Sequence, residues 1–186
     1  MAEATSELDL EQYRAYLVLM AKSLWDSKFQ SRCDASDLAQ QTLLEAYKRL
    51  DQFKGKSPGE QAAWLRGILA HNVADAIRAL RRKKRDPRLE QSISAALDDS
   101  SCRLVSCLAA DQSSPSERAA RAEQLNRLAD ALARLPTDQE EAVRLHHLRG
   151  LSLADTARQM GRTVAAVAGL LRRGLEAIRE SMGERE

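Results

Sequence analysis

The sequence has 186 residues, enough for one domain or two small ones, and its composition excludes several classes of protein. Aromatic residues make up only 4% of the chain, and glycine and proline are scarce at 8 and 4 residues, which favours an all-α fold. The formal net charge of +2 excludes a generic polycation, so any affinity for nucleic acid must come from local patches. No apolar run is long enough for a membrane span, and the acidic start is not a signal peptide, which predicts a cytoplasmic protein. The three cysteines, Cys33, Cys102 and Cys107, make no disulfide framework, which predicts reduced thiols.

Two amphipathic helices are predicted at the start of the chain. The first covers about residues 9–28, with one apolar face made by Tyr13, Leu17, Met20 and Leu24. The second begins after Asp34, a good N-cap, and carries a predicted buried stripe made by Leu38, Leu44, Tyr47 and Leu50. That stripe leaves polar side chains on the outer face, namely Gln40, Gln41, Glu45 and Lys48.

A third helix is predicted over about residues 62–84, after a loop at 54–61 that is rich in glycine, proline and lysine. Its apolar contacts would come from Trp64, Leu65, Ile68, Leu69, Val73, Ile77 and Leu80. The helix ends in a run from Arg78 to Arg88 with seven basic residues and one acidic residue, a local charge of 7 − 1 = +6. One or two lysines would be enough to complement a helix dipole, so this cluster is better suited to neutralising phosphates.

Residues 89–113 differ from the flanking sequence and are predicted to link two domains. The segment is rich in serine and has one basic and four acidic residues, a net charge of 1 − 4 = −3. We expect a plain tether with a short helical patch near residues 104–109. An acidic linker beside basic surfaces could also screen them.

Two more helices are predicted before the last third of the chain. A capping box at Ser114, Pro115 and Glu117 starts one of them, whose apolar stripe is Leu125, Leu128, Leu132 and Leu135. Pro136 ends that helix, and Thr137 starts another that runs to Gly150.

Residues 151–180 have the pattern of a helix-turn-helix. Ser152 can cap the first helix, Gly161 can adopt the left-handed conformation that ends it, and Thr163 can cap the second. The second helix has an apolar stripe (Val164, Val167, Leu171, Leu175 and Ile178) and carries arginines. In a helix-turn-helix, this second helix enters the DNA major groove; the alternative is an ordinary helical hairpin.

The order of these parts resembles that of the extracytoplasmic-function (ECF) sigma factors of bacterial RNA polymerase. Three segments carry the resemblance: DLAQQTLLEAYKRLDQF, WLRGILAHNVADAIRALRR and LPTDQEEAVRLHHLRGLSLADTARQMGRTVAAVAGLLRRGLEAIR. In that family the first docks on the clamp coiled coil of the polymerase's largest subunit, the second reads the promoter −10 element and the third reads the −35 element. The resemblance implies two small helical domains joined by a linker, with an N-terminal domain at 1–88, the linker at 89–113 and a four-helix domain containing the helix-turn-helix at 114–186.

The resemblance also implies which residues contact each partner. Core polymerase would be bound by Asp37, Gln40, Gln41, Glu45 and Lys48. The −10 DNA would be bound by Lys54, Lys56, Arg66, His71, Asn72, Asp75, Arg78, Arg81 and Arg82. The −35 DNA would be bound by Arg162, Thr163, Ala165, Ala166, Gly169, Arg172 and Arg173.

The chain departs from the family pattern at several places. The loop between Phe53 and Trp64 is longer than the common family form, so the pocket for an unpaired base can differ, and Trp64 itself is better suited to a core anchor than to stacking on a base. The spacing leaves open whether His71 or Asn72 matches the family asparagine. Ala168 and Leu170 stand where the family often has basic residues, which predicts weaker or more shape-dependent −35 recognition.

Catalysis is not expected, because the chain has no Gly-rich phosphate loop, no HExxH and no nucleophile elbow. His146 and His147 are neighbours that point about 100° apart on a helix, so we predict no metal site, and we predict no cofactor and no small-molecule substrate. The predicted partners are core RNA polymerase, promoter DNA and, as in many family members, an anti-sigma factor. Two other interpretations stay open, a stand-alone helix-turn-helix regulator and a structural helical adaptor.

Overall fold

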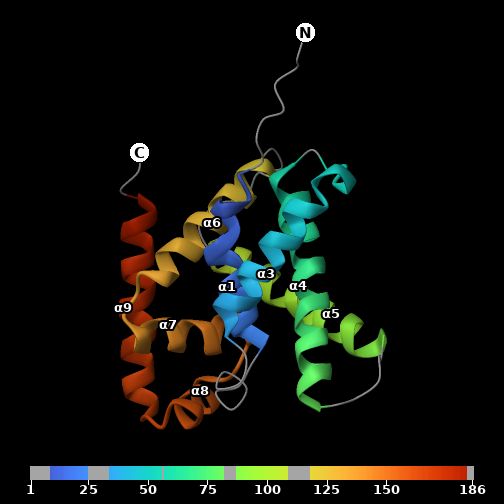
Figure 1. Cartoon of the computed structure of the whole chain (residues 1–186). Helices are drawn as coiled ribbons and strands as arrows, with labels where there is room; N and C mark the ends of the chain where they lie inside the picture. Colours follow the sequence, from blue (N-terminus) through green and yellow to red (C-terminus); the bar gives the residue numbers. More distant parts are fainter. Residues whose placement is uncertain (1–8, 25–33, 56, 82–86, 109–117, 184–186) are drawn as a thin grey trace.

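The computed structural model describes residues 9–24, 34–55, 57–81, 87–108 and 118–183, and its regular elements within these ranges are all helices (Figure 1). In chain order they are η1 (Leu10–Tyr13), α1 (Arg14–Leu24), α3 (Ala35–Lys48), η2 (Leu50–Gln52), α4 (Pro58–Arg81), α5 (Pro87–Leu108), α6 (Arg118–Ala133), α7 (Thr137–Val143), η5 (Arg144–Leu148), α8 (Leu153–Met160) and α9 (Val164–Gly183). The all-α prediction is confirmed for this part of the chain. None of these helices has both the length and the apolar character that spanning a bilayer requires.

Some predicted features lie outside the described residues. They are the end of the first helix (25–28), Lys56, Arg82 and most of the basic run (82–86), residues 109–113 of the linker, the capping box at 114–117, and Cys33. Backbone but no side chain is described for Arg81 and Cys107.

The N-terminal half is built from α1, α3 and α4 around a buried apolar core (Tyr16, Leu17, Met20, Leu38, Leu43, Leu65 and Leu69). The predicted cap of α3 is confirmed, because the amide of Ser36 donates to the Asp34 carboxylate at 2.9 Å. The third predicted helix, α4, begins at Pro58 instead of residue 62. Ser57 and Glu60 form a capping box there, with each side chain accepting from the other residue's amide, at 3.3 Å for Ser57 and 3.0 Å for Glu60.

Most of the predicted linker is a long helix, α5, so the expectation of a tether with only a short helical patch is wrong for the described part. Ile93, Leu97 and Leu104 are buried at helical spacing. Two of the serines that suggested a flexible tether, Ser100 and Ser101, are buried contacts. Tyr16 and Ser101 share a hydrogen bond of 3.0 Å, and Ser23 donates to Ser100 at 3.2 Å, which ties α5 to α1.

The C-terminal half contains α6, α7 with the π-helical turn η5, and the predicted helix-turn-helix as α8 and α9. Ser152 caps α8, accepting from the amide of Asp155 at 3.0 Å. Gly161 is left-handed with φ of 63°, and Thr163 accepts from the amide of Ala166 at 3.2 Å to cap α9. The turn and both caps are therefore as predicted.

The two halves lie against one another and share one continuous buried core across the described residues. Figure 1 shows α6 crossing beside α1, and α6 contacts α1 and α4. At this junction the Arg144 guanidinium donates to the carbonyl of Lys22 at 3.3 Å, and Glu140 lies 3.7 Å from the Lys22 ammonium. The two predicted helical domains are therefore packed together in the described part of the chain, an arrangement that the sequence left open.

Candidate nucleic-acid interface

The outer face of α9 is the open face of the helix-turn-helix. Val167, Leu170 and Leu171 point into the core, whereas Ala165, Ala166, Arg172 and Arg173 are exposed among residues of the first three turns. Val164, placed by the sequence in the buried stripe, is 47% exposed. Small residues at the start of this face leave the helix backbone open to close approach, as a helix that enters a DNA groove requires.

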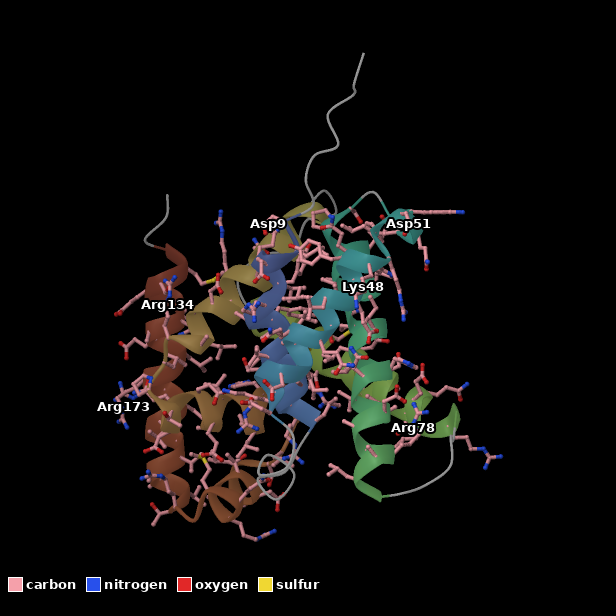
Figure 2. All side chains as sticks on the ribbon, in the orientation of Figure 1. Asp9, Lys48, Asp51, Arg78, Arg134 and Arg173 are labelled. Atoms are coloured by element: carbon pink, nitrogen blue, oxygen red, sulfur yellow. The ribbon has the colours of Figure 1, made fainter. Side chains whose placement is uncertain are left out.

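The arginines of this face differ in how strongly they are held. Arg162 forms an ion pair with Asp138 at 2.5 Å, and Arg172 lies 3.8 Å from Glu176. Arg173 projects from the outer side of α9 (Figure 2), with its guanidinium over Gly169, where an added Cβ would lie 3.3 Å from it. Arg172 and Arg173 are thus better placed for phosphates than Arg162, which would have to leave Asp138.

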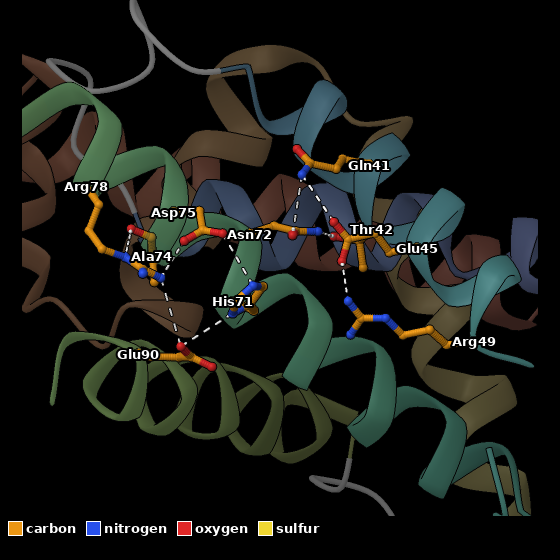
Figure 3. Close-up of polar contacts among 10 residues, drawn as sticks. All are labelled: Gln41, Thr42, Glu45, Arg49, His71, Asn72, Ala74, Asp75, Arg78 and Glu90. Carbon is orange, nitrogen blue, oxygen red and sulfur yellow. Dashed lines mark hydrogen bonds and ion pairs between the residues drawn. The ribbon is translucent and has the colours of Figure 1, made fainter. Parts of the chain in front are cut away.

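The predicted −10 residues of α4 lie in a polar network (Figure 3). His71 faces two carboxylates, with Nε2 at 3.3 Å from Asp75 and Nδ1 at 3.4 Å from Glu90 of α5. Arg78 forms an ion pair with Asp75 at 2.5 Å and lies 4.0 Å from Glu90. Five residues before His71, Arg66 donates to Asp98 of α5 and to the Tyr16 hydroxyl, both at 2.9 Å.

Tyr16 is a buried part of that contact. Desolvation by burial raises the pKa of its hydroxyl, and Arg66 beside it acts in the opposite direction. The hydroxyl is therefore neutral at physiological pH and accepts from Arg66 while it shares a hydrogen bond with Ser101.

Asn72 does not lie where the −10 prediction places it. Its side chain is buried at 2% exposure, donates to the Thr42 hydroxyl at 3.2 Å and accepts from Gln41 at 3.5 Å (Figure 3). Its amide thus joins α3 to α4. In this structure Asn72 cannot contact DNA, whereas His71 is partly exposed at the surface.

The remaining predicted −10 residues are less constrained. Lys54 is exposed on the loop before α4. Trp64 packs on Phe53 with ring centroids 4.9 Å apart and is only partly buried, which agrees with the predicted core anchor. Side chains of Lys56, Arg81 and Arg82 lie outside the described part.

The outer face of α3 carries the predicted polymerase contacts and two more side chains that the sequence misplaced. Asp37, Gln40, Gln41 and Lys48 are exposed and Glu45 is half-buried. Leu44 and Tyr47, predicted to be buried, are 54% and 42% exposed on this face. Leu38 is buried as predicted, and the other side chains of α3 that contact the core are mostly small, namely Ala35, Ala39, Thr42, Leu43 and Ala46.

An exposed leucine and tyrosine between polar residues are characteristic of a protein-binding surface. We call Gln40, Gln41, Leu44, Tyr47 and Lys48 the α3 surface. Arg49 and Glu45 form an ion pair of 3.5 Å at its edge. The signal that could have identified this surface is the spacing 35, 38, 39, 42, 43 and 46, in which alanines and a threonine join Leu38 and Leu43 to make a better helical stripe than the large residues alone.

Comparisons with known proteins match both halves of the chain. The family model for sigma-70 region 2 matches residues 10–83, and that for sigma-70 region 4 matches residues 125–178. The curated relatives include the ECF RNA polymerase sigma factor SigC of Mycobacterium tuberculosis, 32% identical over 148 residues, which are 77% of this chain and 68% of the relative.

Two further curated relatives and one solved structure are also similar. SigD of Mycobacterium tuberculosis is 28% identical over 175 residues, 93% of this chain and 74% of the relative. BldN of Streptomyces coelicolor is 32% identical over 149 residues, 79% of this chain, and the chain spans 50% of its length. The solved structure is the sigma factor RpoE with the anti-sigma factor NepR from Bartonella quintana, with 22% identity, coverage of 95% and 96%, and a TM-score of 0.36.

Proposed function

The chain belongs to the ECF sigma factors of bacterial RNA polymerase, non-catalytic transcription initiation factors, and from this premise we propose how its surfaces divide the work of a sigma factor. The α3 surface binds core polymerase, α4 and the loop before it bind −10 DNA, and α8 with α9 bind −35 DNA. In terms of sequence, residues 1–88 and 114–186 carry the two sets of contacts, and the predicted linker, residues 89–113, connects them. The protein acts in the cytoplasm, where the polymerase performs the chemistry and this chain supplies promoter choice.

The observation that carries the polymerase assignment is the exposure of Leu44 and Tyr47. Large apolar side chains in water are unfavourable, and burying them against a partner recovers the hydrophobic free energy. Asp37, Gln40, Gln41 and Lys48 surround them as a polar rim, which gives direction to the contact. A stand-alone DNA-binding regulator has no use for such a surface on the half of the chain that lacks the helix-turn-helix.

The observation that carries the −35 assignment is the exposed face of α9. Its first three turns offer small side chains for close approach and two exposed arginines, Arg172 and Arg173, for phosphates. Because no exposed arginine or lysine of the described α9 precedes Arg172, direct base readout by long side chains is limited near its start. We therefore propose that −35 recognition depends on the shape and backbone of the DNA.

The test is reconstitution of transcription with core polymerase. The wild-type chain is expected to direct initiation at specific sites in a genomic promoter library, with start sites mapped by sequencing. Leu44→Ala with Tyr47→Ala is expected to weaken binding to core polymerase by roughly tenfold or more, as for interface anchors. Val164→Ala, a substitution of an exposed apolar residue in the other half, is the matched control and is expected to leave that affinity unchanged.

The outcomes separate the alternatives. DNA binding without any affinity for core polymerase would favour the stand-alone regulator. Absence of specific initiation together with absence of DNA binding would favour the structural adaptor. Equal weakening by both sets of substitutions would mean that the α3 surface has no special part in docking.

A further inference from the structure

The linker helix α5 lies along α4 and presents carboxylates to the cations that are predicted to bind DNA. Glu90 faces His71 at 3.4 Å and Arg78 at 4.0 Å, and Asp98 accepts a hydrogen bond from Arg66 at 2.9 Å. Each predicted −10 basic residue of α4 whose side chain is described (Arg66, His71 and Arg78) therefore has an α5 carboxylate beside it. We call these five residues the α4–α5 clasp.

The clasp covers the cations. The side chains of Arg66 and Arg78 are 16% and 13% exposed, and those of their partners Asp98 and Glu90 are 56% and 36% exposed. The carboxylates thus lie on the solvent side of the guanidiniums, at the position where a DNA phosphate would have to bind. A phosphate and a carboxylate make the same kind of charge-assisted contact with arginine, so both cannot occupy it together.

The apolar side of α5 fixes this arrangement. Ile93 and Leu97 lie between the two acidic positions in the sequence and are buried, at 7% and 0% exposure. Glu90 and Asp98 are eight residues apart, so about two turns of helix separate the contacts. The helix therefore presents both carboxylates to α4 as one body.

The guanidinium of Arg78 is only partly satisfied: its Nε donates to the carbonyl of Ala74, whereas its other buried nitrogen is left without a hydrogen bond. Its Nη2 atom is buried and has ion-pair partners, but it makes no hydrogen bond of good geometry. A buried donor without a hydrogen bond is unfavourable, so a ligand that offers better acceptors can compete for it.

We propose that α5 is an autoinhibitory element whose Glu90 and Asp98 compete with DNA phosphates for Arg66 and Arg78, so that the free protein binds DNA through α4 only weakly. This inference rests on the proposed −10 role of α4. It gives the acidic linker a screening role, which its sequence allows as an alternative to a plain tether.

The test uses the full chain without polymerase and a fluorescent single-stranded DNA 20-mer of random sequence, followed by anisotropy over a series of salt concentrations. The two proteins that are compared, with and without substitutions in the clasp, both carry Arg172→Ala and Arg173→Ala, so that α9 contributes less to the measured DNA binding. Glu90→Gln with Asp98→Asn is expected to bind roughly tenfold more tightly, because Arg66 and Arg78 lose their α5 carboxylates and gain phosphate contacts, while Arg78 keeps only Asp75 of its own helix as an ion-pair partner. For the same reason the slope of log affinity against log salt is expected to steepen by about 1.4.

The matched control makes the same change in net charge away from the clasp. Asp51→Asn with Asp99→Asn removes two exposed carboxylates, one of them next to Asp98, and is expected to leave the slope unchanged. Equal tightening in both double variants would show a general charge effect and overturn the inference, as would no tightening in either. If the clasp variant unfolds by circular dichroism, Asp98→Asn against Asp99→Asn gives the same comparison with one charge.

Failure here is distinguishable from failure of the proposed function. A protein that binds core polymerase and initiates at specific promoters, but whose clasp variant binds DNA no better, would overturn the autoinhibition alone. A chain without affinity for core polymerase would overturn the proposed function, whatever the anisotropy shows.

Discussion

At the scale of single residues, Asn72 shows how a predicted DNA contact can be a structural one. Its carboxamide connects Thr42 and Gln41 of α3 to α4 from a buried position. The Thr42 hydroxyl donates to the carbonyl of Leu38 at 2.7 Å and accepts a hydrogen bond from the Asn72 amide. Removing the amide leaves a buried hydroxyl with less hydrogen bonding, which is costly.

We therefore expect Asn72→Ala to lower the free energy of unfolding by about 1–3 kcal/mol. The measurement is urea unfolding followed by circular dichroism. Gln40→Ala, on the exposed face of α3, is the control and is expected to change stability by less than about 0.5 kcal/mol. Unchanged stability of Asn72→Ala combined with a loss of −10 DNA affinity would return Asn72 to the role of a base-reading residue.

Residues with purely local roles were predictable, and those whose role depends on a partner helix were not. Asp34, Ser152, Gly161 and Thr163 cap or end helices through bonds within a few positions of themselves, so their neighbours in sequence decide the outcome. Leu44 was misplaced because apolar size suggested burial. The buried face of α3 is made largely by small residues, and only the packing of α1 and α4 reveals that.

At the scale of elements, α5 departs most from the prediction. A segment rich in serine with a net charge of −3 has the composition of a tether, yet residues 87–108 form a helix. Leu89, Ile93 and Leu97 give it an apolar stripe at i, i+4 and i+8. Ser100 and Ser101 continue the buried side because a small hydroxyl can approach α1 closely and find a hydrogen-bond partner there. The composition of this segment therefore suggested a tether, whereas the spacing of its apolar residues would have predicted the helix.

The helix α9 was predicted correctly, and its arginines lead to a prediction about salt. Arg172→Ala with Arg173→Ala is expected to lower the slope of log affinity for duplex DNA against log salt by about 1.8, because two phosphate contacts are lost. The measurement is duplex binding by anisotropy at several salt concentrations. Arg179→Ala removes an exposed arginine two turns further along the same helix and is the control. An unchanged slope in the double variant would count heavily against phosphate contacts by this face.

At the scale of the whole molecule, the two halves share a core that the sequence did not predict. Lys22, Glu140 and Arg144 connect α1 to α7 and η5, with Arg144 and Glu140 only 5% and 8% exposed. Ala15 of α1 and Ala129 and Ala133 of α6 line the junction, and small side chains allow the two helices to approach closely. Periodicity marks which face of a helix is buried, but it cannot say which partner covers that face. The family match to residues 10–83 and 125–178 defines two parts in sequence, and in this structure the parts are packed as one body.

A shared core makes a direct prediction about unfolding. Both tryptophans, Trp25 and Trp64, are in the N-terminal half, so their fluorescence reports on that half, whereas circular dichroism reports on all helices. Leu132 is buried in α6 of the other half, at 1% exposure, and Leu132→Ala is expected to cost about 2–5 kcal/mol. Since cooperative unfolding couples everything that packs into one core, we expect the fluorescence and dichroism midpoints in urea to coincide and to fall together in this variant.

Arg134→Ala, an exposed position in the turn that follows α6, is expected to move neither midpoint. A fluorescence midpoint that stays fixed while the dichroism transition splits in Leu132→Ala would mean that the halves unfold independently, and that the packed arrangement adds little to stability in solution.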